Sequence, residues 1–187
     1  MGLNPYKTNE QLYYELIGAA DPEDISAKPY VQFGIKAEPA LRQLFRLNHP
    51  ELKISYRKNN LVTRPDLPGA HASLDGWTAD KAGRLGILEI KTTEIMASQH
   101  KEKWRDRIPD NYYIQLLHYM MITGAEYADL TALLRWRFSG SVLQRIQEYH
   151  IEREEVAEDI ALLEHSERQF IQAVKDRRKP ALTLPAI

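Results

Sequence analysis

The sequence predicts a mixed α/β (α+β) protein in which helices flank a central mixed β-sheet. Between residues 50 and 92, short runs with apolar and polar residues in alternation are separated by turn residues, a pattern typical of strands. Helical periodicity appears before and after this region, and two further strand segments follow near residue 130. The order is therefore helix, three or four strands, helix, two strands and helix, which favours a mixed sheet covered by helices.

Composition excludes several classes of protein. The chain has 187 residues, no cysteine, 25 Lys and Arg against 26 Asp and Glu, and 43% hydrophobic residues. This length suits one domain over residues 1–187 with a substantial core. The lack of cysteine excludes disulfide scaffolds, thiolate metal sites and cysteine nucleophiles. No apolar run is long enough to span a bilayer, and the first twenty residues lack a signal peptide's apolar middle, so we expect a cytoplasmic protein without a membrane partner.

Two helices are expected before the strands. The first covers residues 8–18, where Thr8 or Asn9 can cap its beginning and Gly18 can end it. The second covers residues 34–48 and carries an apolar stripe formed by Leu41, Leu44, Phe45 and Leu47.

The beginning of this second helix is set by proline chemistry. A loop from Asp21 to Pro29 precedes it, and Pro39 lies inside the periodic segment. Because proline is tolerated only near the first turn of a helix, we expect the helix to begin around Ala37 or Glu38.

Four strand segments follow the helices. Residues 51–58 and 60–64 are expected to pair with each other around an Asn-Asn turn. Residues 70–78 predict one further strand, and residues 85–93 the next, joined to it by a turn that contains Gly83.

The last part of the chain predicts a helix, a strand hairpin and a long helix, over residues 111–123, 129–151 and 152–178. Asn111 is expected to cap the first of these helices and Gly124 to end it. The long final helix carries an apolar stripe formed by Val156, Ile160, Leu163, Phe170 and Val174.

The strand segment ILEIK carries the most informative chemistry. Alternation places Leu88 and Ile90 on one face and Glu89 and Lys91 on the other. The hairpin before it would bring Asp75 close to Glu89, and two converging carboxylates repel each other unless a cation lies between them. Hard oxygen ligands suit Mg²⁺ or Mn²⁺, and a neighbouring lysine can act on water or stabilise a phosphate in the transition state. The pattern therefore fits metal-dependent phosphodiester hydrolysis.

A structural explanation competes with this functional one. An aspartate followed by Glu-x-Lys occurs by chance in many proteins, and alone it is more often a surface hairpin with a cross-strand ion pair. The other segments of the chain decide between the two interpretations.

Five segments, in order, resemble the lambda-exonuclease and YqaJ-like viral recombinase nucleases, a branch of the PD-(D/E)XK superfamily. GLNPYKT is similar to the stretch that follows the family's first motif, and GIKAEPALRQLF resembles its Glu-Pro helix with a following arginine. SLDGW and LEIKT resemble the metal-binding motifs, and YYIQLLHYM resembles the Gln-x-x-x-Tyr helix. The resemblance implies a PD-(D/E)XK, restriction-endonuclease-like core.

The resemblance also implies roles for individual residues. Asp75 and Glu89 would be metal ligands, with the Ile90 carbonyl as a third, and Lys91 would act on the attacking water. Glu38 would complete the acidic site directly or through water. Two further residues, Gln115 and Tyr119, would line the site and touch the water or the DNA backbone.

Each of these side chains also has a simpler explanation. Glu38 would be favoured by the macrodipole at a helix N-terminus, and Gln115 with Tyr119 could be an amphipathic pair at the core edge. Pro65-Asp66 spells the superfamily's literal "PD", but the family pattern places the aspartate before Gly-aromatic, at Asp75. We therefore expect Asp66 to be a turn residue.

DNA contacts are expected from two places. The arginine of the Glu-Pro helix, Arg42, is one, and a basic segment interleaved with Trp104 is the other, comprising Lys101, Lys103, Arg105 and Arg107. A solvated loop is the simpler explanation for that segment. The net charge of −1 gives no global basic field.

The resemblance implies a Mg²⁺- or Mn²⁺-dependent deoxyribonuclease, an exonuclease on linear double-stranded DNA in phage-type recombination, located in the cytoplasm of a bacterium or phage-infected host. A single-strand annealing protein would be a partner, and family members can form ring-shaped trimers. The family's leading segment, which contacts the 5′-phosphate of a DNA end, is missing before GLNPYKT. Three alternatives therefore stay open: an endonuclease or nickase, a catalytically silent DNA-binding module on the same fold, and an unrelated structural protein.

Overall fold

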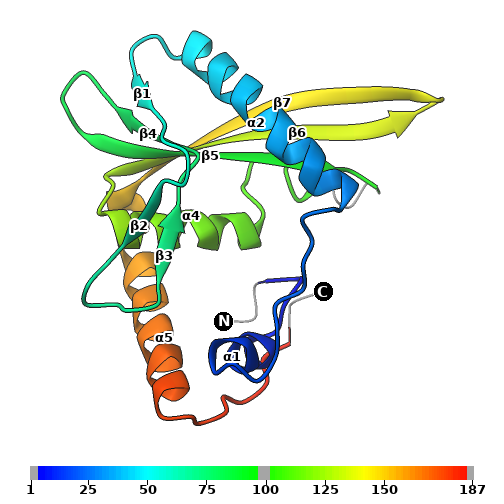
Figure 1. Ribbon diagram of the computed structural model, residues 1–187. Helices are drawn as coiled ribbons and strands as arrows, with labels where there is room; N and C mark the ends of the chain where they lie inside the picture. Colours follow the sequence, from blue (N-terminus) through cyan, green and yellow to red (C-terminus); the bar gives the residue numbers. More distant parts are fainter. Residues whose placement is uncertain (1–3, 97–101, 185–187) are drawn as a thin grey trace.

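In the computed structural model, which describes residues 4–96 and 102–184, helices cover both faces of one mixed β-sheet (Figure 1). The strand order is β1-β4-β5-β6-β7; the β5–β6 pair is parallel, and the other neighbouring pairs are antiparallel. This confirms the predicted mixed sheet flanked by helices. The strands are β1 (Lys53–Ser55), β4 (Gly76–Ala79), β5 (Leu85–Glu94), β6 (Tyr127–Phe138) and β7 (Ser141–Glu152).

A second, two-stranded sheet and five helical segments complete the described fold. The small sheet pairs β2 (Leu61–Thr63) with β3 (His71–Ser73). The helical segments are α1 (Asn9–Leu16), α2 (Pro29–Asn48), α4 (Asp110–Thr123), the 3₁₀ helix η1 (Arg153–Val156) and α5 (Ala157–Lys175).

The central strand β5 is buried on both of its faces. On one face, Leu88 and Ile90 pack with Leu41 and Phe45 of α2. On the other, Ile87 belongs to a larger core that includes the buried side chains of α4, Leu116, Leu117, Met120, Met121 and Ile122. The sequence analysis placed core on the Leu88 face alone, so the Glu89 face is more buried than expected. The reason is the parallel crossover from β5 to β6, which lays α4 across that face.

The crossover also explains one glycine. A Cβ atom at Gly86 would lie 2.2 Å from the ring of Tyr127, the first residue of the parallel neighbour β6. Glycine is therefore required where this buried tyrosine crosses β5.

The N-terminal helix α1 lies apart from the sheet and is tied to the C-terminal tail (Figure 1). Thr8 and Gln11 form a capping box at its beginning, and Gly18 follows its end with a φ of 75°, so this predicted helix is confirmed. The Asn9 side chain donates a hydrogen bond to the Ala181 carbonyl and accepts one from the Thr183 N–H.

Helix α2 is longer than expected. It begins at Pro29 rather than near Ala37, and Pro39 lies in its interior. Its core-facing stripe has a spacing of four residues, which extends the helix one apolar position further toward the N-terminus than the sequence analysis recognised: Phe33, Ala37, Leu41 and Phe45. Two predicted members of the stripe are wrong, because Leu44 is 37% exposed and Leu47 is 67% exposed.

The strand pairing before β5 also differs from the prediction. Residues 53–55 and 61–63 do not pair with each other; β1 pairs with β4, and β2 pairs with β3. The predicted single strand over residues 70–78 is interrupted at Leu74 and Asp75, so that β3 and β4 belong to different sheets. Leu74 is buried and anchors this break.

The second half agrees more closely with the prediction. The β6–β7 hairpin and both helices are present, and Gly124 ends α4 with a φ of 73°. Asn111 is not the cap of α4, because the helix begins at Asp110 after Pro109. The final helix starts as the 3₁₀ turn η1 and not as a continuous helix from residue 152.

Candidate active site

The strand break after β3 brings two carboxylates together. In the β4–β5 register Gly76 lies opposite Leu88, so Asp75 precedes that pair on one strand while Glu89 follows it on the other. The Asp75 carboxylate accepts a hydrogen bond from the Ile90 N–H at 2.8 Å. The expected approach of Asp75 to Glu89 is therefore present, and the break in the strand is what frees the aspartate side chain for it.

Glu89 is held from two elements. It is 3% exposed, and its Oε1 atom accepts hydrogen bonds from Lys91 Nζ at 2.5 Å and from Gln115 Nε2 at 3.1 Å. Gln115 also donates to the hydroxyl of Tyr119 at 2.8 Å, one turn further along α4. The second carboxylate oxygen, Oε2, is buried without a partner among the described residues. An unpaired buried carboxylate oxygen is costly, and it marks a position where a cation would be favourable.

Arg42 and Glu38 of α2 lie on the other side of Asp75. The guanidinium of Arg42 donates to the Asp75 backbone carbonyl at 2.7 Å through Nε, and it pairs with the Glu38 carboxylate through its other end. It also lies 3.6 Å from the centre of the Tyr56 ring. Arg42 thereby connects α2, β1 and the strand break.

The charges of this cluster act on one another. Burial, followed by the neighbouring charge of Glu89, raises the pKa of Asp75 to about 7. Burial also raises the pKa of Glu89, although Lys91 opposes that shift. For Lys91, burial acts to lower the pKa, but the attraction and hydrogen bond of Glu89 outweigh it, and its pKa is raised. The site thus holds an excess of negative charge around one ammonium group.

The donor set fits a hard divalent cation. Two carboxylates, one of them with an orphaned oxygen, supply the oxygen ligands that Mg²⁺ and Mn²⁺ prefer. Within residues 4–96 and 102–184, no three His, Asp or Glu side chains form a metal-binding group by themselves.

A comparison with known protein families agrees with this geometry. The YqaJ-like viral recombinase domain matches residues 1–126 of the 187. The chain belongs to this family. A curated relative, the uncharacterized protein YqaJ of Bacillus subtilis (strain 168), is 29% identical over 128 residues, which are 68% of this chain and 37% of that protein. The chain therefore spans less than half the length of this relative.

Solved structures share the fold of this YqaJ-family chain. The alkaline exonuclease LHK-Exo from Laribacter hongkongensis matches with a TM-score of 0.61 and 20% identity over 89% of this chain and 79% of that one. The structure of LHK-Exo in complex with dAMP matches with a TM-score of 0.60 and 18% identity, over 90% and 78% of the two chains. At these identities the likeness establishes a common fold.

The YqaJ-type site residues named from the sequence converge, with one qualification about Arg42. Asp75, Glu89, Lys91, Gln115 and Tyr119 are linked through hydrogen bonds or direct charge interactions, and Glu38 acts on both acids. Arg42 is 7% exposed and committed to Glu38 and the Asp75 carbonyl. It supports the site from within the protein, whereas the sequence analysis expected it on the DNA-facing surface.

The predicted basic segment is divided by the structure. Lys101 lies outside the described residues. Lys103, Arg105 and Arg107 are exposed, and Arg105 pairs with Glu102 at 2.9 Å. Trp104 is 3% exposed and belongs to the core. The exposed basic side chains remain predicted DNA contacts.

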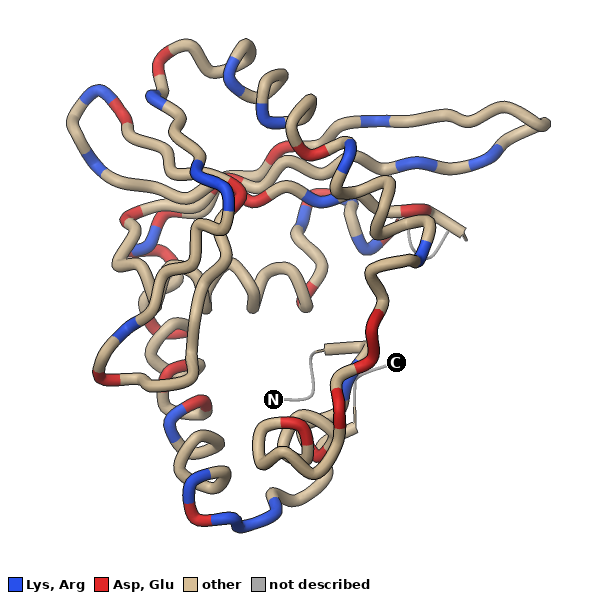
Figure 2. The backbone as a smooth tube through the Cα atoms, viewed as in Figure 1, with Lys and Arg blue, Asp and Glu red and all other residues tan. Residues whose placement is uncertain are grey.

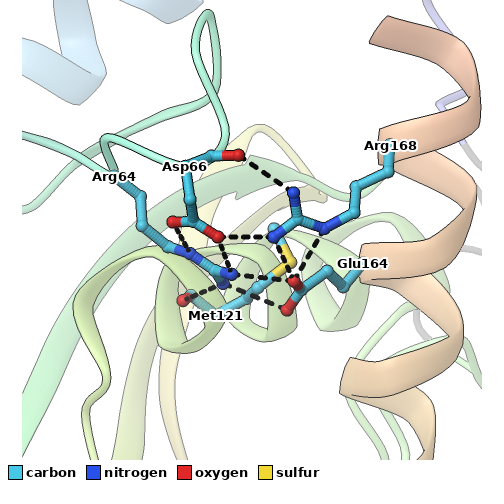
Figure 3. A network of polar contacts seen from close by, with 5 residues as sticks. All are labelled: Arg64, Asp66, Met121, Glu164 and Arg168. Atoms are coloured by element: carbon cyan, nitrogen blue, oxygen red, sulfur yellow. Dashed lines mark hydrogen bonds and ion pairs between the residues drawn. The ribbon is translucent and has the colours of Figure 1, made fainter. Parts of the chain in front are cut away.

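Asp66, the aspartate of the literal Pro-Asp motif, has a different task (Figure 3). It pairs with Arg64 at 2.8 Å and with Arg168 of α5 at 2.5 Å, while Glu164 of α5 bonds both arginines. Arg64 also donates to the Met121 carbonyl at the end of α4. This network fastens the β2–β3 connection to α4 and α5, in agreement with the expectation that Asp66 is a turn residue.

A cleft of about 990 Å³ approaches the site from the other side of α4. It lies between the N-terminal segment, α4 and α5, and Gln115 is one of its lining residues, together with Tyr6, Asn111, Tyr112, His118 and Phe170. Gln115 therefore connects the acidic cluster to this cleft. The sequence analysis did not find the cleft, because its lining residues come from three separate segments. It also missed Tyr56, which has no spacing relationship to Arg42 that a sequence pattern reveals.

No helix that the structure describes is long and apolar enough to cross a membrane.

Proposed function

We propose that the chain is a metal-dependent DNA nuclease that hydrolyses phosphodiester bonds. The single observation that supports this most strongly is the convergence of Asp75 and Glu89 beside Lys91, with one Glu89 oxygen buried and unpaired. Two acids and a lysine meet here at the point where a strand is interrupted, which is a costly arrangement in a fold without a ligand. Such strained polar clusters are concentrated at functional sites.

Asp75 and Glu89 would hold the cation, Mg²⁺ or Mn²⁺, with the backbone carbonyl of Ile90 as a third ligand. When bound, the cation would neutralise the two carboxylates and stabilise the negative charge that develops on the phosphate. Glu38 would contribute through water, since its carboxylate is paired with Arg42.

The remaining residues would orient the reactants. The ammonium of Lys91 carries a positive charge next to Glu89 and would donate a hydrogen bond to the attacking water or to a phosphate oxygen. Gln115 fixes the Glu89 carboxylate and the Tyr119 hydroxyl, and that hydroxyl keeps its own proton for donation to a phosphate oxygen. These contacts hold the groups before the substrate arrives, which lowers the reorganisation needed during reaction.

An exonuclease on linear duplex DNA, acting in phage-type recombination, is the activity that family membership and fold favour. The family is named for viral recombinases, and the proteins with the shared fold include an alkaline exonuclease. A single-strand annealing protein as partner and a trimeric assembly are part of the same proposal.

The test is digestion of linear and closed-circular duplex DNA with Mg²⁺, with Mn²⁺ or with EDTA. The wild-type chain should degrade linear DNA in either metal and spare circles, and Glu89→Gln should lower the rate by about 10²-fold or more. The matched control is Asp66→Asn, which also removes one carboxylate but lies outside the site. Cleavage of circles would identify an endonuclease instead. DNA binding without cleavage of either substrate would identify a silent DNA-binding module, and neither binding nor cleavage would refute the proposal.

A further inference from the structure

The β6–β7 hairpin extends well beyond the rest of the sheet (Figure 1). The last residue of β5 to pair with β6 is Glu94, opposite Arg135, so the hairpin continues from there as two strands alone. We call residues 135–145 the arm. Its turn contains Ser139 and Gly140, both with positive φ, which is the backbone of a tight two-residue hairpin turn.

The surface of the arm is unusual for a part of the fold that packs against nothing. Residues 137–145 are all exposed, and they include Phe138 at 67%, Val142 at 47% and Leu143 at 41%. An isolated two-stranded ribbon is marginally stable in water, and exposed apolar side chains gathered at its end mark an interaction surface.

The charge of the arm indicates which partner it fits. Arg135, Arg137 and Arg145 lie on it, and no Asp or Glu occurs between residues 130 and 147, in a chain with as many acidic as basic residues. Figure 2 shows blue and no red along the projecting part. Arg135 is occupied by the Phe33 ring at 3.7 Å and by Glu94 at 3.6 Å. Neither Arg137 nor Arg145 forms an ion pair with any residue that the structure describes, so both are available to an anionic partner.

The strand register relates the arm to the candidate active site. Lys91 lies opposite Ala132 in the β5–β6 pair, and side chains alternate along β6, so Phe138 projects from the same sheet face as Lys91 and Glu89. Leu143 and Arg145 of β7 lie opposite Trp136 and Leu134 and share that face. Six residues separate Ala132 from Phe138, which is about 20 Å along a strand. That distance corresponds to roughly six base pairs of duplex, at about 3.4 Å each.

We propose that the arm binds the backbone of the duplex DNA that flanks the phosphodiester to be cleaved, without sequence preference. Arg137 and Arg145 contact phosphates, and the apolar end lies against the sugars of a groove wide enough for a two-stranded ribbon. This inference rests on the proposed nuclease function and adds to it the surface that holds the substrate outside the site.

The test compares two double variants that lose the same charge. Arg137→Gln/Arg145→Gln removes the two free arginines of the arm, and Arg177→Gln/Arg178→Gln removes two arginines after α5. Binding of a 30-base-pair duplex is measured by fluorescence anisotropy with Ca²⁺ in place of Mg²⁺, over a series of salt concentrations. Cleavage kinetics of the same duplex are measured with Mg²⁺. Light scattering gives the oligomeric state of each variant.

The arm variant should bind about tenfold more weakly, and the slope of log affinity against log salt should become shallower by about 1 to 2, since each phosphate contact contributes about 0.9. Its KM should rise while kcat stays near the wild-type value, and the control should resemble wild type. Equal losses in both double variants would overturn the inference in favour of a general charge effect. An altered oligomeric state with an unchanged salt slope would also overturn it, because the arm would then bind a second copy.

These outcomes are separable from a failure of the proposed function. Wild-type cleavage with an unaffected arm variant refutes the arm and leaves the nuclease standing. DNA binding by wild type without cleavage, weakened in the arm variant, supports the arm and refutes the nuclease. If the wild type neither binds nor cleaves DNA, both proposals fail.

Discussion

The carboxylate of Asp75 accepts a hydrogen bond from the backbone N–H of Ile90, the residue that follows Glu89. This contact joins the interrupted strand to the middle of β5, and it places one acid beside the other despite their mutual repulsion. The bond lowers the cost of ionising Asp75, while burial and Glu89 raise it, and the pKa of Asp75 is raised to about 7 as the net effect. The fold therefore tolerates a destabilised acidic pair at this position.

Replacing Asp75 with Asn should separate the stability of the fold from cation binding. At pH 8 the wild-type carboxylate is ionised against its environment, so the metal-free Asp75→Asn variant should melt at the same or a higher temperature. Mg²⁺ at about 100 times its Kd should stabilise wild type by about 2.7 kcal/mol and leave the variant unchanged. Calorimetric melts with and without Mg²⁺ measure both effects, and a wild-type melting temperature that ignores Mg²⁺ contradicts the cation site.

Arg42→Lys should damage the site although it keeps the charge. Lysine cannot bond the Asp75 carbonyl and Glu38 together while it stacks on Tyr56, because it lacks the planar fork of arginine. We expect a loss of about 2 kcal/mol in the free energy of unfolding and a tenfold or larger fall in kcat. Urea melts and cleavage kinetics provide the measurements, and Arg46→Lys, one turn later on α2, is the control. A rise in KM alone, with a shallower salt slope, would instead make Arg42 a DNA contact.

Asp66→Asn should lower the melting temperature and leave cleavage intact. The variant weakens the attachment of the β2–β3 connection to α5, because Arg64 and Arg168 each lose a charged partner. Arg64 holds the pKa of Asp66 well below its usual range, and Arg168 adds to this effect. A thermal melt and a DNA digestion on the same preparation suffice. Loss of cleavage in a variant that still folds would mean that the literal Pro-Asp motif is the functional one.

His118 should make stability depend on pH. Its two ring nitrogens face acceptors, the Glu167 carboxylate at 2.7 Å and the His71 carbonyl at 2.9 Å, and both can be satisfied only by the protonated ring. Burial acts to lower the pKa of His118, but its bond to Glu167 outweighs that, and the pKa is raised.

A raised histidine pKa stabilises the fold fully below the unfolded value of about 6.5, and the contribution disappears as the pH rises through the folded value. Wild type should therefore exceed His118→Gln in melting temperature most clearly at pH 6, by on the order of 1 kcal/mol, and the gap should narrow toward pH 9. A gap that is constant or widens with pH contradicts this assignment. Comparing the two chains at each pH cancels the contributions of His49 and His150, which also lie between acceptors.

The sequence predicted the elements that follow from periodicity and failed where tertiary contacts decide. The β6–β7 hairpin and the strand with Glu89 and Lys91 follow from alternation, which local sequence determines. The break at Asp75 does not, since residues 70–78 alternate continuously and only the packing of Leu74 and the competition between two sheets divide them. Helix α2 extends past its expected start because Phe33 packs on the sheet, a contact that overrides the local preference against an interior proline.

For the candidate site, residue types and order were enough to name the acids, the lysine and the α4 pair. The position of Arg42 was not predictable, because an arginine on an amphipathic helix is ordinarily solvated and its burial depends on the distant Tyr56 and Asp75. The arm was assigned to a plain hairpin for a similar reason: its length beyond β5 follows from where pairing stops at Glu94.

The parallel pairing of β5 with β6 has a consequence for how the protein must be synthesised. The acids, Lys91, Gln115 and Tyr119 all precede residue 126, but β6 begins at Tyr127. A ribosome-bound chain that has released only the family-matched portion would present β5 as a long apolar edge, with unpaired backbone groups ready to join another chain. The nascent enzyme is therefore aggregation-prone, and its acidic pair has no rigid frame, until the next hairpin has left the exit tunnel.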